Sequence, residues 1–132
     1  MNVDCVLDTS SLIAYIREEL GAEQVRKRLR FSRCLMHAIN VAEFLFTAPK
    51  RMPGLFTPES AFAWFTAADI DTANILDPDF LQTTAKIRLA ERSLSLGDGM
   101  AIALASMLEV PVVTSERNFK KAGDYANIEL IR

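Results

Sequence analysis

The stretch LSLGDGMAIALASMLEVPVVTSERNF, residues 94–119, decides the fold of this chain. Near its start an acid, Asp98, stands between two glycines, and the run that follows is apolar almost all round, as in a buried helix. A β-branched run over 110–115 comes next and ends in polar residues. A buried helix that leads directly into a buried strand is typical of a parallel sheet covered by helices.

The same alternation extends over the rest of the chain. Apolar runs predict four further strands, at 2–7, 34–39, 70–76 and 127–131, and helical patterns lie around them, at 12–16, 23–30, 40–48, 59–68 and 78–94. The helix after Asp98 is expected to extend to about residue 109, and the Pro-rich segment 49–58 predicts a loop. We therefore expect one α/β domain over residues 1–132, a three-layer α/β/α sandwich with a central, mostly parallel five-stranded sheet.

The composition suits a small protein of the cell interior. Half of the residues are hydrophobic, which is enough for a core without disulfides, so we expect Cys5 and Cys34 to be reduced and buried. The first residues do not resemble a signal peptide, and no apolar run approaches the ~20 residues that a membrane span needs. The sequence thus predicts a soluble, cytoplasmic chain that does not enter membranes.

Four acids fall where a parallel sheet binds ligands, beyond the carboxyl ends of its strands. Asp8 and Glu116 directly follow strands, Glu43 lies early in the helix after the second strand, and Asp98 opens the helix before the fourth. Each acid alone is compatible with a helix cap or an exposed position. Together they repel unless one is protonated or a cation binds, and an all-oxygen cation site favours Mg²⁺ or Mn²⁺ over zinc. The one histidine, His37, is expected in the core. Such a site suits hydrolysis of a phosphodiester.

Four segments resemble the PIN-domain ribonucleases, and within them the VapC-type toxins of toxin–antitoxin pairs: VLDTSSLIAYI, INVAEFL, the stretch quoted above, and the C-terminal strand. The resemblance implies a Mg²⁺-dependent endoribonuclease toxin, with Mn²⁺ as a possible substitute, that cleaves structured or single-stranded RNA; transfer RNA is the favoured substrate and ribosomal RNA loops are another. It also implies a homodimer and a cognate antitoxin. The implied metal ligands and catalytic residues are Asp8, Glu43, Asp98 and Glu116, with Ser10 and Thr114 hydrogen-bonded behind them.

Two features of the motif qualify this resemblance. The family usually has Thr-Ala-Asp-Arg-Asp-Phe where this chain has Glu116 and Asn118 in place of the two aspartates. A non-catalytic PIN-like module that binds RNA or a protein is therefore the alternative function. We interpret Gly97 and Gly99 as leaving room for metal and phosphate beside Asp98. A receiver domain needs paired acids and a haloacid-dehalogenase-type phosphatase needs Asp-x-Asp, and the first strand is followed by neither.

Charge and aromatic residues are unevenly distributed, although the net charge is only −2. The basic run 26–33 places Arg26 and Arg30 on one helix face, and we expect these two residues and Arg117 to contact the RNA backbone; a solvated face or one that binds the antitoxin is the alternative. Six of the eleven aromatic residues are Phe44, Phe46, Phe56, Phe62, Trp64 and Phe65. We expect some of them to form an apolar groove for an antitoxin helix or for the second protomer.

Overall fold

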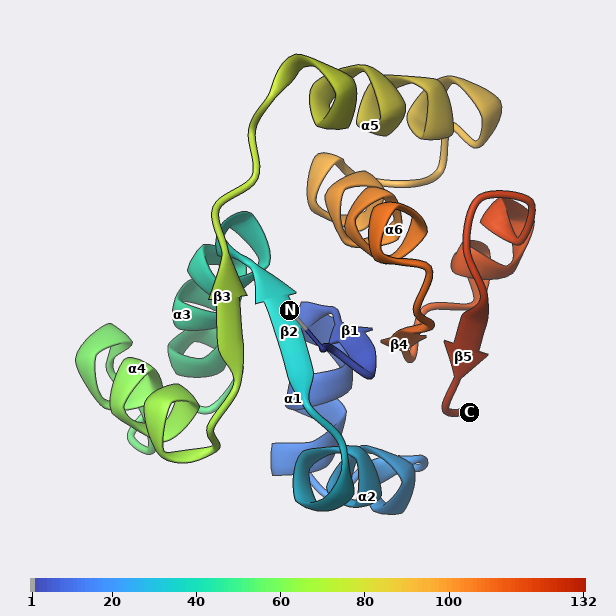
Figure 1. Ribbon diagram of the computed structural model, residues 1–132. Coiled ribbons are helices and arrows are strands. Elements are labelled where there is room, and N and C mark those ends of the chain that lie inside the picture. The colour runs from blue at the N-terminus through green and yellow to red at the C-terminus, as the bar shows by residue number, and fades with distance from the viewer. Residues whose placement is uncertain (1) are drawn as a thin grey trace.

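A five-stranded sheet with the order β3-β2-β1-β4-β5 runs through the middle of the computed structural model, which describes residues 2–132 (Figure 1). The strands are β1 (Cys5–Leu7), β2 (Cys34–His37), β3 (Asp71–Ala73), β4 (Val112–Thr114) and β5 (Ile128–Leu130). All four neighbouring pairs are parallel. Every predicted strand is present, and each is shorter than its apolar run because the ends of the run lie outside the ladder.

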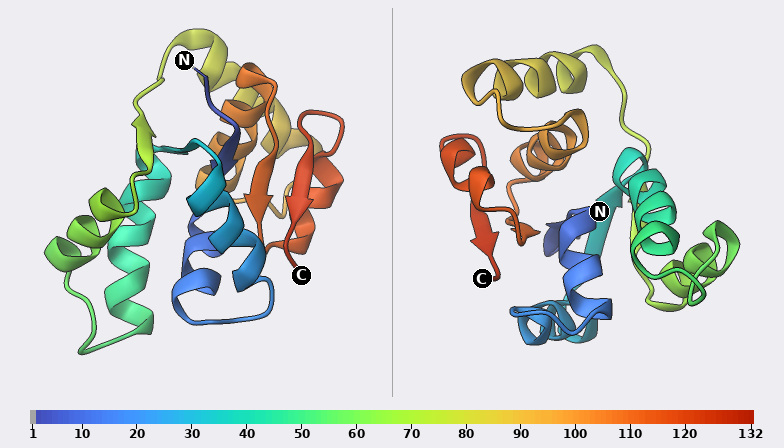
Figure 2. Two further views of the ribbon diagram at one scale, coloured as in Figure 1. Left: turned by 60° about the horizontal axis from the view of Figure 1, so that its bottom comes forward. Right: turned by 180° about the vertical axis from the view of Figure 1, so that it is seen from behind.

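Helices cover both faces of this sheet, as the alternating pattern predicted. They are α1 (Thr9–Ile16), α2 (Ala22–Phe31), α3 (Ala38–Arg51), α4 (Pro58–Ala67), α5 (Pro78–Ala90) and α6 (Leu96–Leu108), with a 3₁₀ helix, η1 (Arg117–Ala122), before β5. Figure 1 shows α5 and α6 on the opposite side of the sheet from α1 and α2, and the view from behind in Figure 2 shows the same separation. The three-layer α/β/α prediction is confirmed.

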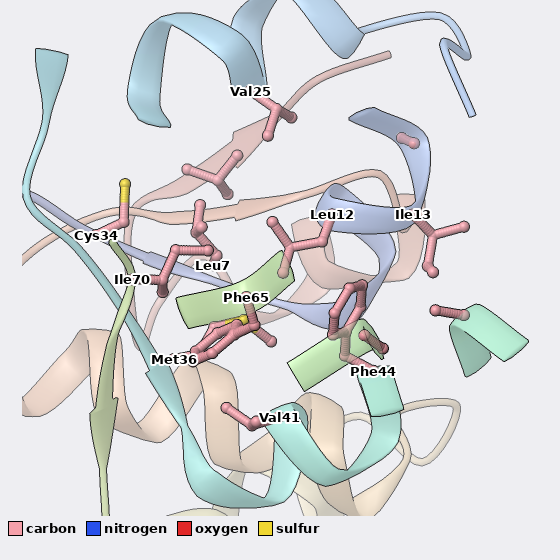
Figure 3. Close-up of a cluster of buried hydrophobic side chains, with 14 of the residues drawn as sticks. Leu7, Leu12, Ile13, Val25, Cys34, Met36, Val41, Phe44, Phe65 and Ile70 are labelled. Carbon is pink, nitrogen blue, oxygen red and sulfur yellow. The ribbon is translucent and has the colours of Figure 1, made fainter. Parts of the chain in front are cut away.

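The strand side chains divide the core into two halves. Leu7 of β1 packs with Leu12, Phe44 and Phe65 from α1, α3 and α4, and Figure 3 shows these side chains converging. The next residue towards the N-terminus, Val6, faces the other way and packs against α5 and α6. The cysteines of β1 and β2 lie opposite each other, buried and free, with 3.6 Å between their sulfurs, so the expectation of reduced thiols is confirmed.

Three predicted boundaries were wrong. Helix α3 does not end at residue 48 but continues through Pro49 to Arg51, because the N–H of Met52 still bonds to the carbonyl of Ala48 at 2.9 Å. Helix α5 ends at Ala90 rather than at residue 94, and η1 was not predicted. Helix α6 begins before Asp98, at Leu96, for a reason that concerns the site.

His37 is buried, as expected, but at the end of β2 rather than inside the strand. Its Nδ1 accepts the N–H of Ile39 at 3.1 Å and caps α3, while its ring stacks on Phe80 at a centroid distance of 5.0 Å. These contacts give the histidine a structural role. Separately, none of the helices among residues 2–132 combines the length and apolarity required to cross a membrane.

Candidate active site

A cavity of about 230 Å³ opens at the carboxyl ends of the strands, and all four predicted acids line it. Asp8 comes from the end of β1, Glu43 from α3, Asp98 from the first turn of α6, and Glu116 from the residues after β4. The four positions are far apart in the chain. Parallel pairing of β1 with β2 and β4 brings them to one edge of the sheet.

Asp8 is the most enclosed of these acids, at 3% exposure. Its carboxylate accepts hydrogen bonds from the hydroxyl of Thr114 at 2.6 Å, the hydroxyl of Ser10 at 2.9 Å and the N–H of Ser11 at 2.9 Å. Burial raises the pKa of Asp8 from 3.8 to about 7; the hydrogen bonds oppose this shift and the charge of Asp98 adds to it. The predicted supporting residues Ser10 and Thr114 thus fix the orientation of this carboxylate.

Glu43 is held by Asn40, a residue that the sequence patterns did not mark as part of the site. The amide of Asn40 donates to Glu43 Oε1 at 3.0 Å and to the carbonyl of Gly97 at 3.1 Å, so it joins the first turns of α3 and α6. Asn40 is 2% exposed, and its Oδ1 has no hydrogen-bond partner among the described residues. Burial and the charge of Asp98 raise the pKa of Glu43. The sequence feature that could have identified Asn40 as a partner of Glu43 is their i, i+3 spacing on one helix.

Asp98 lies inside α6 rather than before it. Ser95 is the N-cap: its hydroxyl accepts the N–H of Asp98 at 3.1 Å, and the Asp98 carboxylate accepts the N–H of Ser95 at 2.9 Å. This reciprocal capping box explains why the helix begins two residues earlier than expected. It also keeps the carboxylate of Asp98 at the N-terminal end of the helix, beside the cavity.

The two glycines beside Asp98 serve purposes other than those predicted. A Cβ on Gly97 would lie 2.6 Å from Cδ of Glu43, so this glycine makes room for a second carboxylate. A Cβ on Gly99 would lie 2.9 Å from Cγ of Arg88, so that glycine allows α5 to pack closely on α6. The interpretation that both clear space for metal and phosphate was wrong for Gly99, and for Gly97 the space belongs to Glu43.

Glu116 differs from the other three acids because it is exposed at the rim of the cavity. Its backbone N–H donates to the Thr114 hydroxyl at 3.0 Å, the same hydroxyl that donates to Asp8. The backbone of Glu116 is therefore held beside Asp8 through Thr114, and its side chain, one methylene longer than that of aspartate, lies at the rim of the cavity.

The three arginines predicted to contact RNA lie outside the lining of this cavity. Arg26 pairs with Glu23 at 2.7 Å on α2, and Arg26 and Arg30 line a second hollow together with Tyr15 and Trp64. Arg117 is exposed at the start of η1. The arginines that line the acid-lined cavity are instead Arg51 and Arg132. The sequence patterns did not predict them as site residues, because neither lies in one of the motifs that contain the acids.

The acids of the cavity have the chemistry of a divalent-cation site but not its arrangement. Among residues 2–132, no three acid, histidine or cysteine side chains are arranged ready to hold an ion, because Asp8, Glu43 and Asp98 are turned to hydrogen-bond donors of the protein. The chemistry of the set nevertheless fits Mg²⁺ or Mn²⁺: the donors are carboxylate oxygens, and Asp98 already disfavours ionisation of both neighbouring acids.

A family model described as PIN domain matches residues 5–125. This chain belongs to the PIN-domain family. Similar solved structures include DNA-bound VapBC from Salmonella typhimurium (22% identity, 99% of this chain and 100% of that chain, TM-score 0.71) and VapC20 from Mycobacterium tuberculosis (12%, 91% and 95%, 0.72). VapBC-5 from Mycobacterium tuberculosis is 24% identical over 99% of both chains, with a TM-score of 0.64. At these identities the likeness shows the fold. A search of curated proteins gives no match.

Proposed function

We propose that this PIN domain is a metal-dependent endoribonuclease, the toxin of a toxin–antitoxin pair, and that transfer RNA is its favoured substrate. The observation that carries the proposal is the convergence of Asp8, Glu43, Asp98 and Glu116 on one cavity from four separate parts of the chain. Acids crowd in this way, against their mutual repulsion, where a cation is to be bound. The toxin would act as a homodimer and be neutralised by a cognate antitoxin.

Asp8, Glu43 and Asp98 would hold the cation, Mg²⁺ or Mn²⁺, and Glu116 would complete its environment from the rim. When bound, a cation there would supply positive charge to the phosphodiester and would lower the pKa of a bound water. The hydroxyls of Thr114 and Ser10 keep the Asp8 carboxylate aimed, and Asn40 restrains Glu43. Below pH 7 a proton on Asp8 competes with the cation, because the pKa of Asp8 is raised to about 7.

Similar structures support the toxin assignment. VapC20 is described as a toxin that cleaves the sarcin–ricin loop, and the Salmonella protein was crystallised as VapBC bound to DNA. The alternative, a non-catalytic PIN-like module, is favoured by one observation: Glu116 is exposed and stands where the resembling family usually has aspartate.

The antitoxin contact is proposed at a groove between α1, α2 and α4. Two hollows of about 440 and 550 Å³ share Tyr15, Arg26 and Trp64 and so form one continuous surface, which we name the α1–α2–α4 groove. Arg26 is paired with Glu23 at 2.7 Å and Glu18 also lines the groove, so the positive charge offered to a partner comes from Arg30 at its edge. An antitoxin helix with an apolar face and flanking acids is complementary to this surface. Of the aromatic segment 44–65, only Trp64 lines the groove.

The test is cleavage of transfer RNA by the purified protein with Mg²⁺, with Mn²⁺ and with EDTA. We expect activity only with a divalent cation. Asp8→Asn should lower the rate by more than about 100-fold, beyond the ~10–100-fold typical of a residue that only orients a ligand. Glu116→Gln should cost less, and Asp124→Asn, an exposed acid outside the cavity, should cost nothing.

Two results would decide against hydrolysis. Cleavage by Asp8→Asn in EDTA would mean that a contaminant or a metal-free site does the chemistry. RNA binding by the unaltered protein without any cleavage in Mg²⁺ or Mn²⁺ would support the non-catalytic module.

A further inference from the structure

Three arginines gather around one carboxylate beside the acid-lined cavity. Glu19, just after α1, lies 2.9 Å from Nη1 of Arg132, 3.2 Å from Nε of Arg17 and 3.5 Å from Nη2 of Arg51. The Glu19 side chain is 22% exposed, and Arg51 and Arg132 both line the cavity that holds the four acids. We name Glu19, Arg51 and Arg132 the arginine wall.

The fold builds this wall from three distant parts of the chain. Gly21 has a φ of +95°, and a Cβ there would lie 2.8 Å from Cγ1 of Ile131, so the turn after α1 packs directly on the end of β5. The N–H of Ile131 donates to the carbonyl of Thr114 at 3.0 Å, which keeps Arg132 beside β4. Nη2 of Arg132 then lies 3.4 Å from the hydroxyl of Ser115.

The wall has positive charge and hydrogen-bond donors to spare. One carboxylate faces three guanidinium groups, and each guanidinium has five N–H donors. Arg51 uses one nitrogen in a 3.5 Å contact, and Arg132 uses two. Their side chains are 45% and 33% exposed, so ligands from solvent reach them. Glu19 therefore pairs with the guanidinium groups of Arg51 and Arg132 and leaves most of their N–H donors free.

A phosphate is the ligand that this arrangement fits. The charged side chains in the remainder of the cavity are the four carboxylates, which repel an anion, so a polyanionic strand that enters it needs cationic groups close by. A planar guanidinium pairs with two phosphate oxygens at once. We propose that Arg51 and Arg132 bind backbone phosphate of the RNA beside the reacting bond, each through the N–H donors that its contact with Glu19 leaves free. This rests on the proposed function in that the ligand is RNA.

The test measures binding, so it does not depend on cleavage. The inactive Asp8→Asn protein is titrated with bulk transfer RNA over a salt series, alone and with Arg51→Gln plus Arg132→Gln. We expect the double change to weaken binding about tenfold or more at low salt. The slope of log affinity against log salt should fall by roughly 0.7–0.9 for each phosphate that the protein no longer neutralises. Arg33→Gln is the matched control, because Arg33 pairs with Asp71 at the opposite edge of the sheet.

Glu19→Gln separates a phosphate contact from a merely structural ion pair. It removes the same ion pairs as the arginine changes but leaves the positive charges, so RNA affinity should be kept or increased. If Glu19→Gln weakens binding as the arginine changes do, or if the salt curves of the double change superimpose on those of its parent, the proposal is wrong. Loss of cleavage without these binding effects would leave the proposed function standing and overturn only the arginine wall.

Discussion

The acid-lined cavity and the α1–α2–α4 groove are both built on helix α1, yet they are opposite in character. At the N-terminal end of α1, Asp8 is buried and receives three hydrogen bonds from its surroundings. At the C-terminal end, Tyr15 meets the ring of Trp64 at a centroid distance of 6.2 Å. One end of the helix therefore presents a fixed charge and the other an aromatic surface.

The difference indicates what each region lacks. In the cavity, burial and then the charge of Asp98 raise the pKa of Asp8 and of Glu43, so the component that these acids lack is a cation close to their carboxylates. In the groove the apolar rings are edged by Arg26 and Arg30, and the missing component is an apolar segment with acids. The proposed function places chemistry and recognition at opposite ends of one helix, so changes at one end should leave the other unaffected.

Among the changes that compare the cavity with the groove, the largest effect is expected from Gly97→Ala. The added Cβ displaces the Glu43 carboxylate, and a shift of about 1 Å in such a group costs up to ~100-fold in rate. Folding should be little affected, because alanine in a helix is favoured over glycine by about 0.5–1 kcal/mol and offsets the local crowding. The measurements are the transfer RNA cleavage rate and the melting temperature.

Gly99→Ala is the matched control for that change. Its Cβ meets Arg88 and Thr84 of α5 instead of Glu43, so it should lower the melting temperature more than the cleavage rate. Equal cleavage by Gly97→Ala and the unaltered protein would show that Glu43 has no part in the reaction. Binding of antitoxin should be the same for both variants.

The strand-end argument predicted the fold and the four acids of the cavity because it needs only residue types and element order. Asp8 and Glu116 could be placed by directly following strands. The arginine wall could not, since the contact of Glu19 with Arg132 depends on the packing of Gly21 against Ile131 across the fold. The start of α6 was misplaced because an acid can be either a cap or the third residue of a capping box, and Ser95 decides between them.

The second effect is a pH dependence of stability without metal. The pKa of Asp8 is 3.8 in its reference state and about 7 in the fold, so between these values the folded chain binds a proton that the unfolded chain lacks. Stability should therefore fall as pH rises from about 4 to about 7 and be lowest above it. Asp8→Asn should remove much of this slope, and be the more stable protein at pH 8 by the order of a few kcal/mol.

Urea unfolding at pH 5 and pH 8 in EDTA, followed by the same series in Mg²⁺, measures this directly. Added Mg²⁺ should stabilise the unaltered protein more at pH 8 than at pH 5, and should do little for Asp8→Asn. A lower stability of Asp8→Asn at pH 8 in EDTA would mean that the burial of this charge costs the fold nothing.

The smallest effect is expected at the groove, where Ala67→Glu should weaken antitoxin binding roughly tenfold and leave transfer RNA cleavage unchanged. Ala67 lines the groove beside Trp64, and a carboxylate there repels the acids expected on the antitoxin. Trp64 is the one tryptophan of the chain, so its fluorescence reports this surface alone and should shift when an antitoxin that blocks cleavage is added. Ala85→Glu, at an exposed position of α5 in the other helical layer, is the control. If the antitoxin blocks cleavage without any change in Trp64 emission, it binds elsewhere. The proposal that catalysis lies at one end of α1 and antitoxin binding at the other is then wrong.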